Sequence, residues 1–131
     1  MVFSKIIFST YKSEQVMTSN GNLYMLQYAS FINKDIMNEN IKKIKDYVIY
    51  EVDDKYYVYL GAYTNLETAK RMQKHFENES IYTYIKNDYM SDNTKILKIK
   101  DIDDKILDEK DNKKIIELNK KILNILKSNV S

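Results

Sequence analysis

Between Leu23 and Tyr89, short runs rich in tyrosine, valine and isoleucine alternate with stretches whose apolar residues recur at helical spacing. Aromatic and β-branched runs of this length are typical of strands, whereas apolar residues three or four apart are typical of helices. The order along the chain reads strand, helix, strand, strand, helix, strand. This order predicts an α+β domain built on an antiparallel sheet.

Four segments are predicted as strands. The second and third are separated only by the polar turn Asp53-Asp54-Lys55. Such a short connection joins two strands into a hairpin, so these two strands are expected to run antiparallel. The expected strands are Leu23–Phe31, Tyr47–Val52, Tyr56–Tyr63 and Ile81–Ile85.

Two helices are expected between these strands. The first follows a capping residue, either Asn33 or Asp35. The second begins at a capping-box pattern, in which the hydroxyl of Thr64 is followed three residues later by Glu67. The two helices are expected to end near Lys45 and Asn78.

The order of these elements over residues 23–89 predicts the ferredoxin-like, or split βαβ (βαββαβ), arrangement. In that fold, two helices cover one face of a four-stranded antiparallel sheet, and the other face stays open to solvent or a ligand. Residues 1–22 are expected to be a separate N-terminal segment, either a short strand or a linker. Residues 90–131 are expected to form a helical C-terminal extension.

The composition changes after Tyr89, because no aromatic residue follows and lysine, aspartate and isoleucine dominate. A helix is predicted over 94–107, with the carboxylates of Asp101, Asp103 and Asp104 on its surface. Residues 113–126 form an amphipathic pattern that needs a partner surface. That apolar face packs either on the sheet domain of the same chain, which the pattern slightly favours, or between chains in a protein-interaction or self-association module.

Composition argues against several kinds of site. The chain has no cysteine, so thiolate metal sites, disulfides and cysteine nucleophiles are excluded. Its single histidine, His75, is expected at the surface or boundary of a helix, without a catalytic partner. The acidic stretch 101–111 lacks the ligand spacing of an EF-hand and is expected to be solvated. We therefore expect neither an enzyme nor a metal or cofactor.

Charge and hydropathy narrow the possible partners. The chain carries 21 Lys+Arg against 19 Asp+Glu, and a net charge of +2 does not favour nucleic acid. No apolar run is long enough to span a membrane, and no signal peptide or anchor is evident in the sequence.

Two motifs within 23–89 resemble a known family. Residues 26–31, LQYASF, are similar to the sequence V-Q-V-G-S-F, and residues 57–63, YVYLGAY, are similar to R-V-x-V-G-P-F. The second motif is followed by a polar turn and then by a helix that carries Ala69. Together and in this order they resemble the SPOR domain, the sporulation-related repeat. Ala62 stands where that family has proline, and Tyr57 stands where it often has arginine.

The resemblance implies binding rather than catalysis. SPOR domains bind bacterial peptidoglycan, specifically glycan strands stripped of their stem peptides, through the open face of the sheet. It implies a role in cell division or sporulation. A chain of this kind would lie in the cell envelope, at the septum or the forespore, as part of an anchored or secreted protein.

Strand parity predicts the residues of this face. Gln27 is expected there beside Tyr57, Tyr59 and Gly61. A tyrosine ring packs on the apolar face of a sugar, and the amide of Gln27 suits a hydroxyl or acetamido partner. Ser30 either contacts the ligand or caps the first helix. The expected glycan-binding residues are Gln27, Ser30, Tyr57, Tyr59, Tyr82 and Tyr84.

One further alternative comes from the same topology. A βαββαβ sheet with aromatic residues on its open face also describes an RRM, which binds single-stranded RNA. The low net charge and the missing basic-aromatic core of the third strand argue against it.

Overall fold

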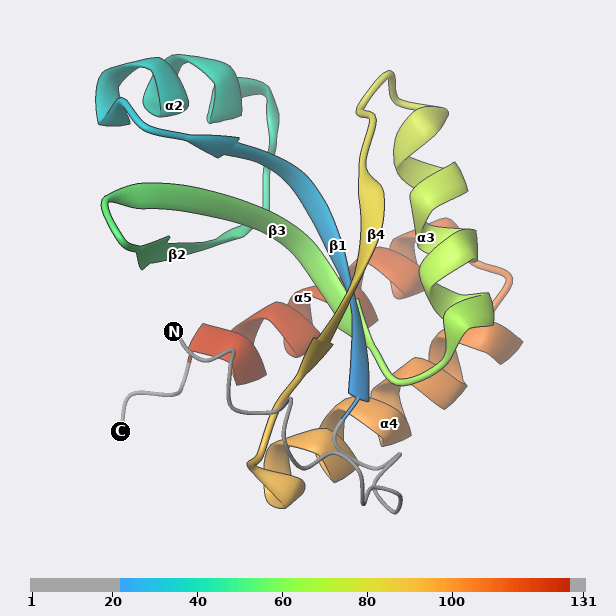
Figure 1. The fold of residues 1–131 in the computed structure, drawn as a ribbon. Helices are drawn as coiled ribbons and strands as arrows, with labels where there is room; N and C mark the ends of the chain where they lie inside the picture. The colour runs from blue at the N-terminus through green and yellow to red at the C-terminus, as the bar shows by residue number, and fades with distance from the viewer. Residues whose placement is uncertain (1–21, 128–131) are drawn as a thin grey trace.

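The computed structural model describes residues 22–127 of the 131-residue chain (Figure 1). Four strands form one sheet in the order β2-β3-β1-β4, and all three neighbouring pairs are antiparallel. The prediction of an α+β fold with a four-stranded antiparallel sheet is therefore confirmed. The expected N-terminal segment lies outside the described residues, except for Asn22. The strands are β1 (Asn22–Phe31), β2 (Val48–Val52), β3 (Lys55–Tyr63) and β4 (Tyr84–Tyr89).

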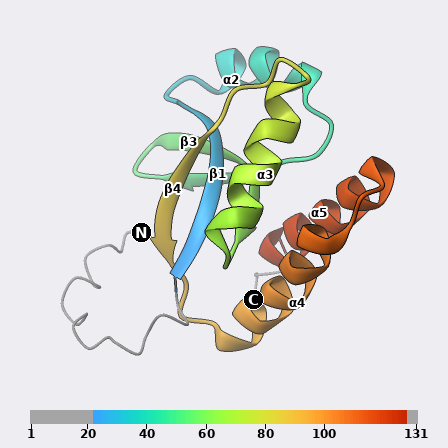
Figure 2. The same ribbon diagram turned by 90° about the vertical axis from the view of Figure 1, so that its right-hand side faces the viewer.

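The helices depart from the expected pair on one face. The first, α2 (Lys34–Asn40), has only seven residues and continues as the short 3-10 helix η2 (Ile41–Lys43). It lies at the end of β1, whereas α3 (Leu66–Glu77) packs along the sheet (Figures 1 and 2). The C-terminal helices α4 (Asn93–Asp108) and α5 (Asn112–Lys127) form a hairpin behind the sheet in the view of Figure 1. The arrangement is thus not the full ferredoxin-like topology.

The first turn of α2 is capped, but the helix buries little apolar surface. Asn33 caps its first turn, since its side chain accepts a hydrogen bond of 3.0 Å from the backbone nitrogen of Ile36. Met37 is the only buried residue of the helix, and Ile41 is buried directly after it. The expected helix to Lys45 is therefore too long by about one turn.

The N-terminus of α3 differs from the capping box predicted for it. Asn65 is the capping residue, and its side chain accepts a hydrogen bond of 3.1 Å from the backbone nitrogen of Glu67. The hydroxyl of Thr64 instead donates to Oδ2 of Asp103 at 2.7 Å. The same oxygen accepts from the backbone nitrogens of Thr64 at 2.7 Å and Asn65 at 3.0 Å. In a capping box, the carboxylate belongs to the third residue of the same helix. Here Asp103 of α4 supplies the carboxylate to the N-terminus of α3.

Asp103 was expected on the surface of its helix, and this expectation is wrong. Its side chain is completely buried, on the same face of α4 as Ile99 and Ile106. Residues four and three apart share a helix face, so the apolar residues that turn α4 toward the sheet also turn Asp103 inward. Three donors surround Oδ2, whereas Oδ1 is buried and has no hydrogen-bond partner within residues 22–127.

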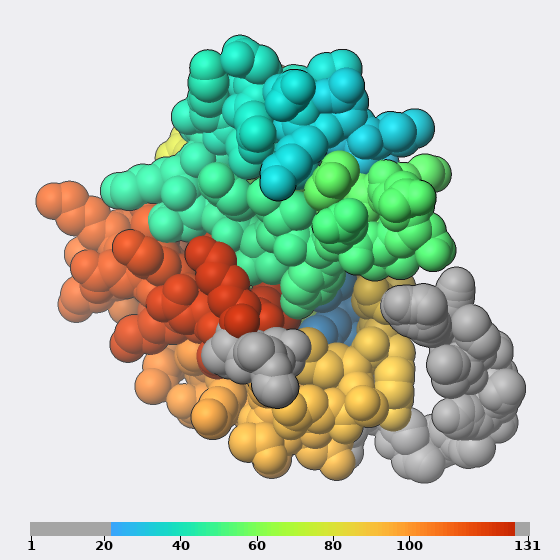
Figure 3. Space-filling view, turned by 90° about the vertical axis from the view of Figure 1, so that its left-hand side faces the viewer, coloured from blue at the N-terminus to red at the C-terminus, as the bar shows by residue number. Residues whose placement is uncertain are grey.

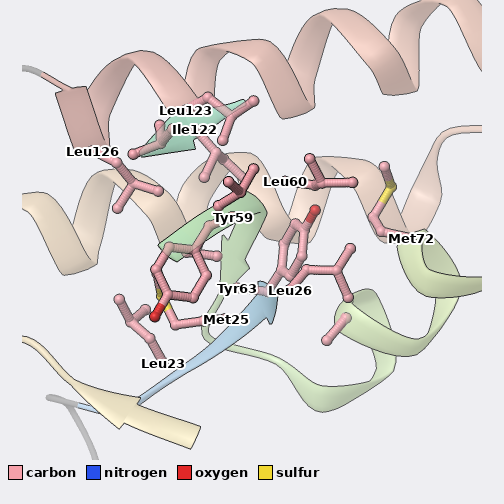
Figure 4. Close-up of a cluster of buried hydrophobic side chains, with 14 of the residues drawn as sticks. Leu23, Met25, Leu26, Tyr59, Leu60, Tyr63, Met72, Ile122, Leu123 and Leu126 are labelled. Atoms are coloured by element: carbon pink, nitrogen blue, oxygen red, sulfur yellow. The ribbon is translucent and has the colours of Figure 1, made fainter. Parts of the chain in front are cut away.

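Helix α5 packs on the sheet domain within the same chain, as the sequence slightly favoured. Ile122, Leu123 and Leu126 belong to the same buried cluster as Tyr59 and Leu60 of β3 (Figure 4). Asn119 of α5 also donates a hydrogen bond of 2.9 Å to the backbone oxygen of Leu60. Because β2 pairs with β3 only as far as Tyr59, α5 covers the part of β3 that β2 leaves unpaired.

The only arginine holds the hairpin of α4 and α5 against α3. The guanidinium of Arg71 donates to the backbone oxygens of Ile106, Leu107 and Glu109 at the end of α4. The last carbonyls of a helix lack the donors that a further turn would supply, so a cationic fork suits them well. The oxygen of Ile106 also accepts a hydrogen bond of 3.2 Å from the backbone nitrogen of Glu109.

The fourth strand begins later than expected. Residues 78–80 form turns, and Ser80 has a φ of 64°. The side chain of Gln73 donates 2.9 Å to the backbone oxygen of Thr83, which ties this loop to α3. Strand pairing starts only at Tyr84, so the expected strand Ile81–Ile85 is wrong in its bounds.

Candidate binding face of the sheet

The strand register brings four residue types together on one face of the sheet. Gln27 of β1 lies opposite Tyr59 of β3 on one side and Tyr84 of β4 on the other. Tyr57 of β3 lies opposite Tyr50 of β2. Directly opposed residues project from the same face of a sheet. We call this surface the tyrosine face, and it consists of Gln27, Ser30, Tyr50, Tyr57, Tyr59, Tyr84, Lys86 and Asp88.

Contacts between side chains agree with this assignment. The rings of Tyr50 and Tyr59 lie 5.5 Å apart at an angle of 59°. The ammonium of Lys86 lies 5.2 Å from the ring centroid of Tyr57, in the geometry of a cation–π contact. The face is therefore a packed cluster that spans all four strands.

The tyrosine face has a buried floor and an exposed rim. Gln27 and Tyr59 are each only 3% exposed. Tyr50, Tyr57 and Lys86 are half-buried, and Tyr84 is 53% exposed. The expectation of an open face applies to the rim alone, because the tyrosines at the rim cover the centre.

At the centre of this face, a polar atom lacks a partner. The side-chain oxygen of Gln27 is buried and accepts no hydrogen bond within the described part of the chain. A buried carbonyl without a donor costs free energy, on the order of 1–3 kcal/mol. A ligand that offers an N–H or O–H group at this point would remove that cost.

Burial keeps Tyr59 of the floor and its half-buried neighbour Tyr50 neutral. Desolvation raises the pKa of Tyr59, and the negative charge of Asp88 raises it further. The same two causes, in the same order, raise the pKa of Tyr50. Both phenols therefore retain the O–H that makes them hydrogen-bond donors.

Gly61 does not belong to this face, contrary to expectation. The register changes between Leu26 and Gln27, where Leu26 lies opposite Gly61 but Gln27 lies opposite Tyr59. The extra residue, Leu60, reverses the alternation of β3. A Cβ atom on Gly61 would lie only 2.0 Å from the hydroxyl of Tyr63. Gly61 thus makes room for a core tyrosine rather than for a ligand.

The predicted site residues divide into two groups. Gln27, Tyr57, Tyr59 and Tyr84 lie together on the tyrosine face. Ser30 lies directly opposite Tyr57, beyond a second register change between Gln27 and Ala29, so it projects from the same face at its exposed end. It does not cap the first helix. Tyr82 is 67% exposed in the loop before β4, so it is not part of the strand.

The sequence interpretation missed three members of the face. Tyr50 follows from the hairpin, because the turn fixes Val52 opposite Lys55 and thereby Tyr50 opposite Tyr57. Lys86 and Asp88 were missed because the fourth strand was expected to end before them.

Other kinds of site have no support in residues 22–127. No group of three or more His, Cys, Asp or Glu side chains in this range is placed to hold a metal ion. His75 is half-buried, edge-on to Phe76, and lies 3.7 Å from the carboxylate of Glu79. None of the helices in this range is long and apolar enough to cross a membrane.

Comparison of the chain with protein-family models, with curated proteins and with solved structures found no match.

Proposed function

We propose that this chain binds a linear glycan, a peptidoglycan strand stripped of its stem peptides, on the tyrosine face and without catalysis. The observation that carries the proposal is the buried, unpaired carbonyl of Gln27 beneath a rim of tyrosines. The acetamido N–H or a hydroxyl of a sugar would donate to this carbonyl once the rim side chains that cover it have moved aside. The rings of Tyr57 and Tyr84 would pack on the apolar faces of the sugars.

The extent of the face supports a polymer rather than a small metabolite. One row of opposed residues crosses all four strands, from Tyr84 through Gln27 and Tyr59 to Val48. Three strand spacings amount to about 14 Å. Several linked sugars are needed to contact a row of this length.

The relation between the two motifs also supports the proposal. Residues 26–31, which resemble the first SPOR motif, pair with residues 56–61, which include most of the second. The strand order β2-β3-β1-β4 is the order expected of a ferredoxin-like sheet, although the short α2 departs from that fold. A ligand of this kind would place the chain at the cell envelope, in division or sporulation.

The test is co-sedimentation with purified peptidoglycan sacculi, with and without prior amidase treatment to remove stem peptides. We expect the wild-type chain to be enriched on the stripped sacculi. Gln27→Leu, which removes the carbonyl at similar volume, should weaken binding about tenfold. It should leave the free energy of unfolding unchanged or higher, because it removes an unpaired buried polar atom.

Two tyrosine variants provide the matched control. Tyr84→Ala, on the rim of the tyrosine face, should weaken binding, whereas Tyr82→Ala, in the loop outside it, should not. Equal binding by both variants, or no binding by the folded wild type, refutes the proposal. Binding to single-stranded RNA that falls steeply with salt would favour the RRM-like alternative instead.

A further inference from the structure

A groove of about 580 Å³ continues the tyrosine face at its β2 side. It lies where β2 and the residues before it meet the end of α5, which are side by side in Figure 3. Tyr50 lines the groove and also belongs to the tyrosine face, so the two surfaces are continuous. The lining used below comprises Lys45, Tyr47, Val48, Tyr50, Leu126 and Lys127.

The groove combines an apolar floor with a positive rim. Val48 is 3% exposed and Leu126 is 2% exposed, and the rings of Tyr47 and Tyr50 stand beside them. Lys45 and Lys127 are exposed, and none of the described residues that line the groove is acidic. A ligand that fits this groove has an apolar part and a negative charge.

We propose that this groove binds the carboxylate-bearing sugar of the glycan strand, an inference that rests on the proposed function. Removal of a stem peptide breaks the amide bond to the lactyl group of every second sugar. The product is a free carboxylate next to a methyl group. The carboxylate would contact Lys45 and Lys127, and the methyl group would lie against Val48 and Leu126.

The position of the groove fits a single strand that occupies both surfaces. Val48 lies opposite Tyr59, which lies opposite Gln27. These two strand spacings amount to about 10 Å, comparable to the length of one disaccharide unit. A sugar whose acetamido group reaches Gln27 therefore has its neighbour along the strand close to the groove. The groove would then distinguish stripped strands from strands that still carry peptides.

The test compares two forms of the same glycan by isothermal titration calorimetry with the full chain. One form is soluble strands from amidase-treated sacculi, and the other is those strands with their carboxylates converted to primary amides. We expect the wild type to bind the carboxylate form about fivefold more tightly, since exposed charge pairs contribute little each. The difference should shrink as salt rises.

Charge-matched variants locate the effect. K45Q/K127Q should bind both forms equally, with the affinity of the wild type for the amidated form. K42Q/K113Q removes two exposed lysines outside the groove and should keep the preference. The inference is overturned if the wild type shows no preference, if K45Q/K127Q retains it, or if K45Q/K127Q also loses binding to the amidated form. Failure of the folded wild type to bind either form overturns the proposed function itself, and this inference with it.

Discussion

Replacing Gly61 with alanine tests the register change in β3. The new Cβ would lie 2.0 Å from the hydroxyl oxygen of Tyr63, 2.5 Å from its ring carbon Cζ and 3.0 Å from Oδ1 of Asn119. Carbon atoms in contact normally lie about 3.5–4.0 Å apart. Tyr63 is fully buried, so its ring has no space into which to retreat.

The expected loss of stability has two parts. Overpacking a filled core costs about 1–3 kcal/mol. Displacing the Tyr63 hydroxyl also breaks its hydrogen bond to Asn119, which leaves a buried carbonyl unpaired at a cost of about 1–3 kcal/mol. Gly61 does not have a positive φ, so alanine also stabilises the fold by about 0.4–1 kcal/mol, because it lowers the conformational entropy of the unfolded chain. We therefore expect Gly61→Ala to lower the free energy of unfolding by about 1–5 kcal/mol.

Urea unfolding of four chains measures this coupling: the wild type, Gly61→Ala, Tyr63→Phe and the double variant. Tyr63→Phe removes the atom nearest the new methyl group and breaks the same hydrogen bond. The double variant should therefore lose less stability than the sum of the single variants, by about 1 kcal/mol or more.

A small effect of Gly61→Ala would refute the reasoning. If the free energy of unfolding falls by less than about 0.5 kcal/mol, as for an ordinary surface substitution, then Gly61 does not face Tyr63. Strand alternation would then continue without interruption, and Gly61 would lie on the tyrosine face. In that case the same variant should weaken glycan binding.

Two further predictions concern buried polar groups. Asp103→Asn should lower the free energy of unfolding by about 1–3 kcal/mol, because the charged acceptor at the N-terminus of α3 is lost. As a control, Asp104→Asn at the exposed neighbouring position should change the free energy of unfolding by less than about 0.5 kcal/mol. Equal losses in the two variants would contradict the capping role of Asp103. The raised pKa values of Tyr50 and Tyr59 mean that these phenols ionise more readily in the unfolded chain. Stability from this source is fully present below about pH 10 and is lost as the pH rises further. Denaturant unfolding between about pH 9 and pH 12 should show this decline, and a Tyr50→Phe/Tyr59→Phe chain with an unchanged slope would exclude these residues as its cause.

Local sequence determined the elements that depend on near neighbours. The turn at Asp53 and Asp54 is one example, because both residues have positive φ, 51° and 66°, as a two-residue hairpin requires. The cap at Asn33 is another, since its donor is three residues away. Short-range patterns of this kind predicted the strands of the sheet. The hairpin register, which the turn fixes, also determines that Tyr50 lies opposite Tyr57.

The candidate site was only partly accessible from the sequence. Parity placed Gln27 beside Tyr59 because alternation along β1 holds as far as Gln27, whereas Tyr57 pairs with Ser30 only after a second register change between Gln27 and Ala29. It failed at Gly61, where one extra residue in β3 exchanges the two faces. The residues beyond Ile85 were missed because strand pairing with β1, and not local propensity, decides where β4 begins and ends.

Only the tertiary structure decided the groups whose partners are distant in sequence. Asp103 looks like one of several surface carboxylates until α4 packs beside α3, and then three donors 38–39 residues away determine its role. Asn119 likewise finds Leu60 and Tyr63 across 56–59 residues. Periodicity predicts which face of a helix is buried, but it does not predict which polar group of a neighbouring element will contact that face. That is why the sequence determined the sheet and its aromatic face, whereas packing of the C-terminal hairpin determined the buried polar contacts and the groove beside that face.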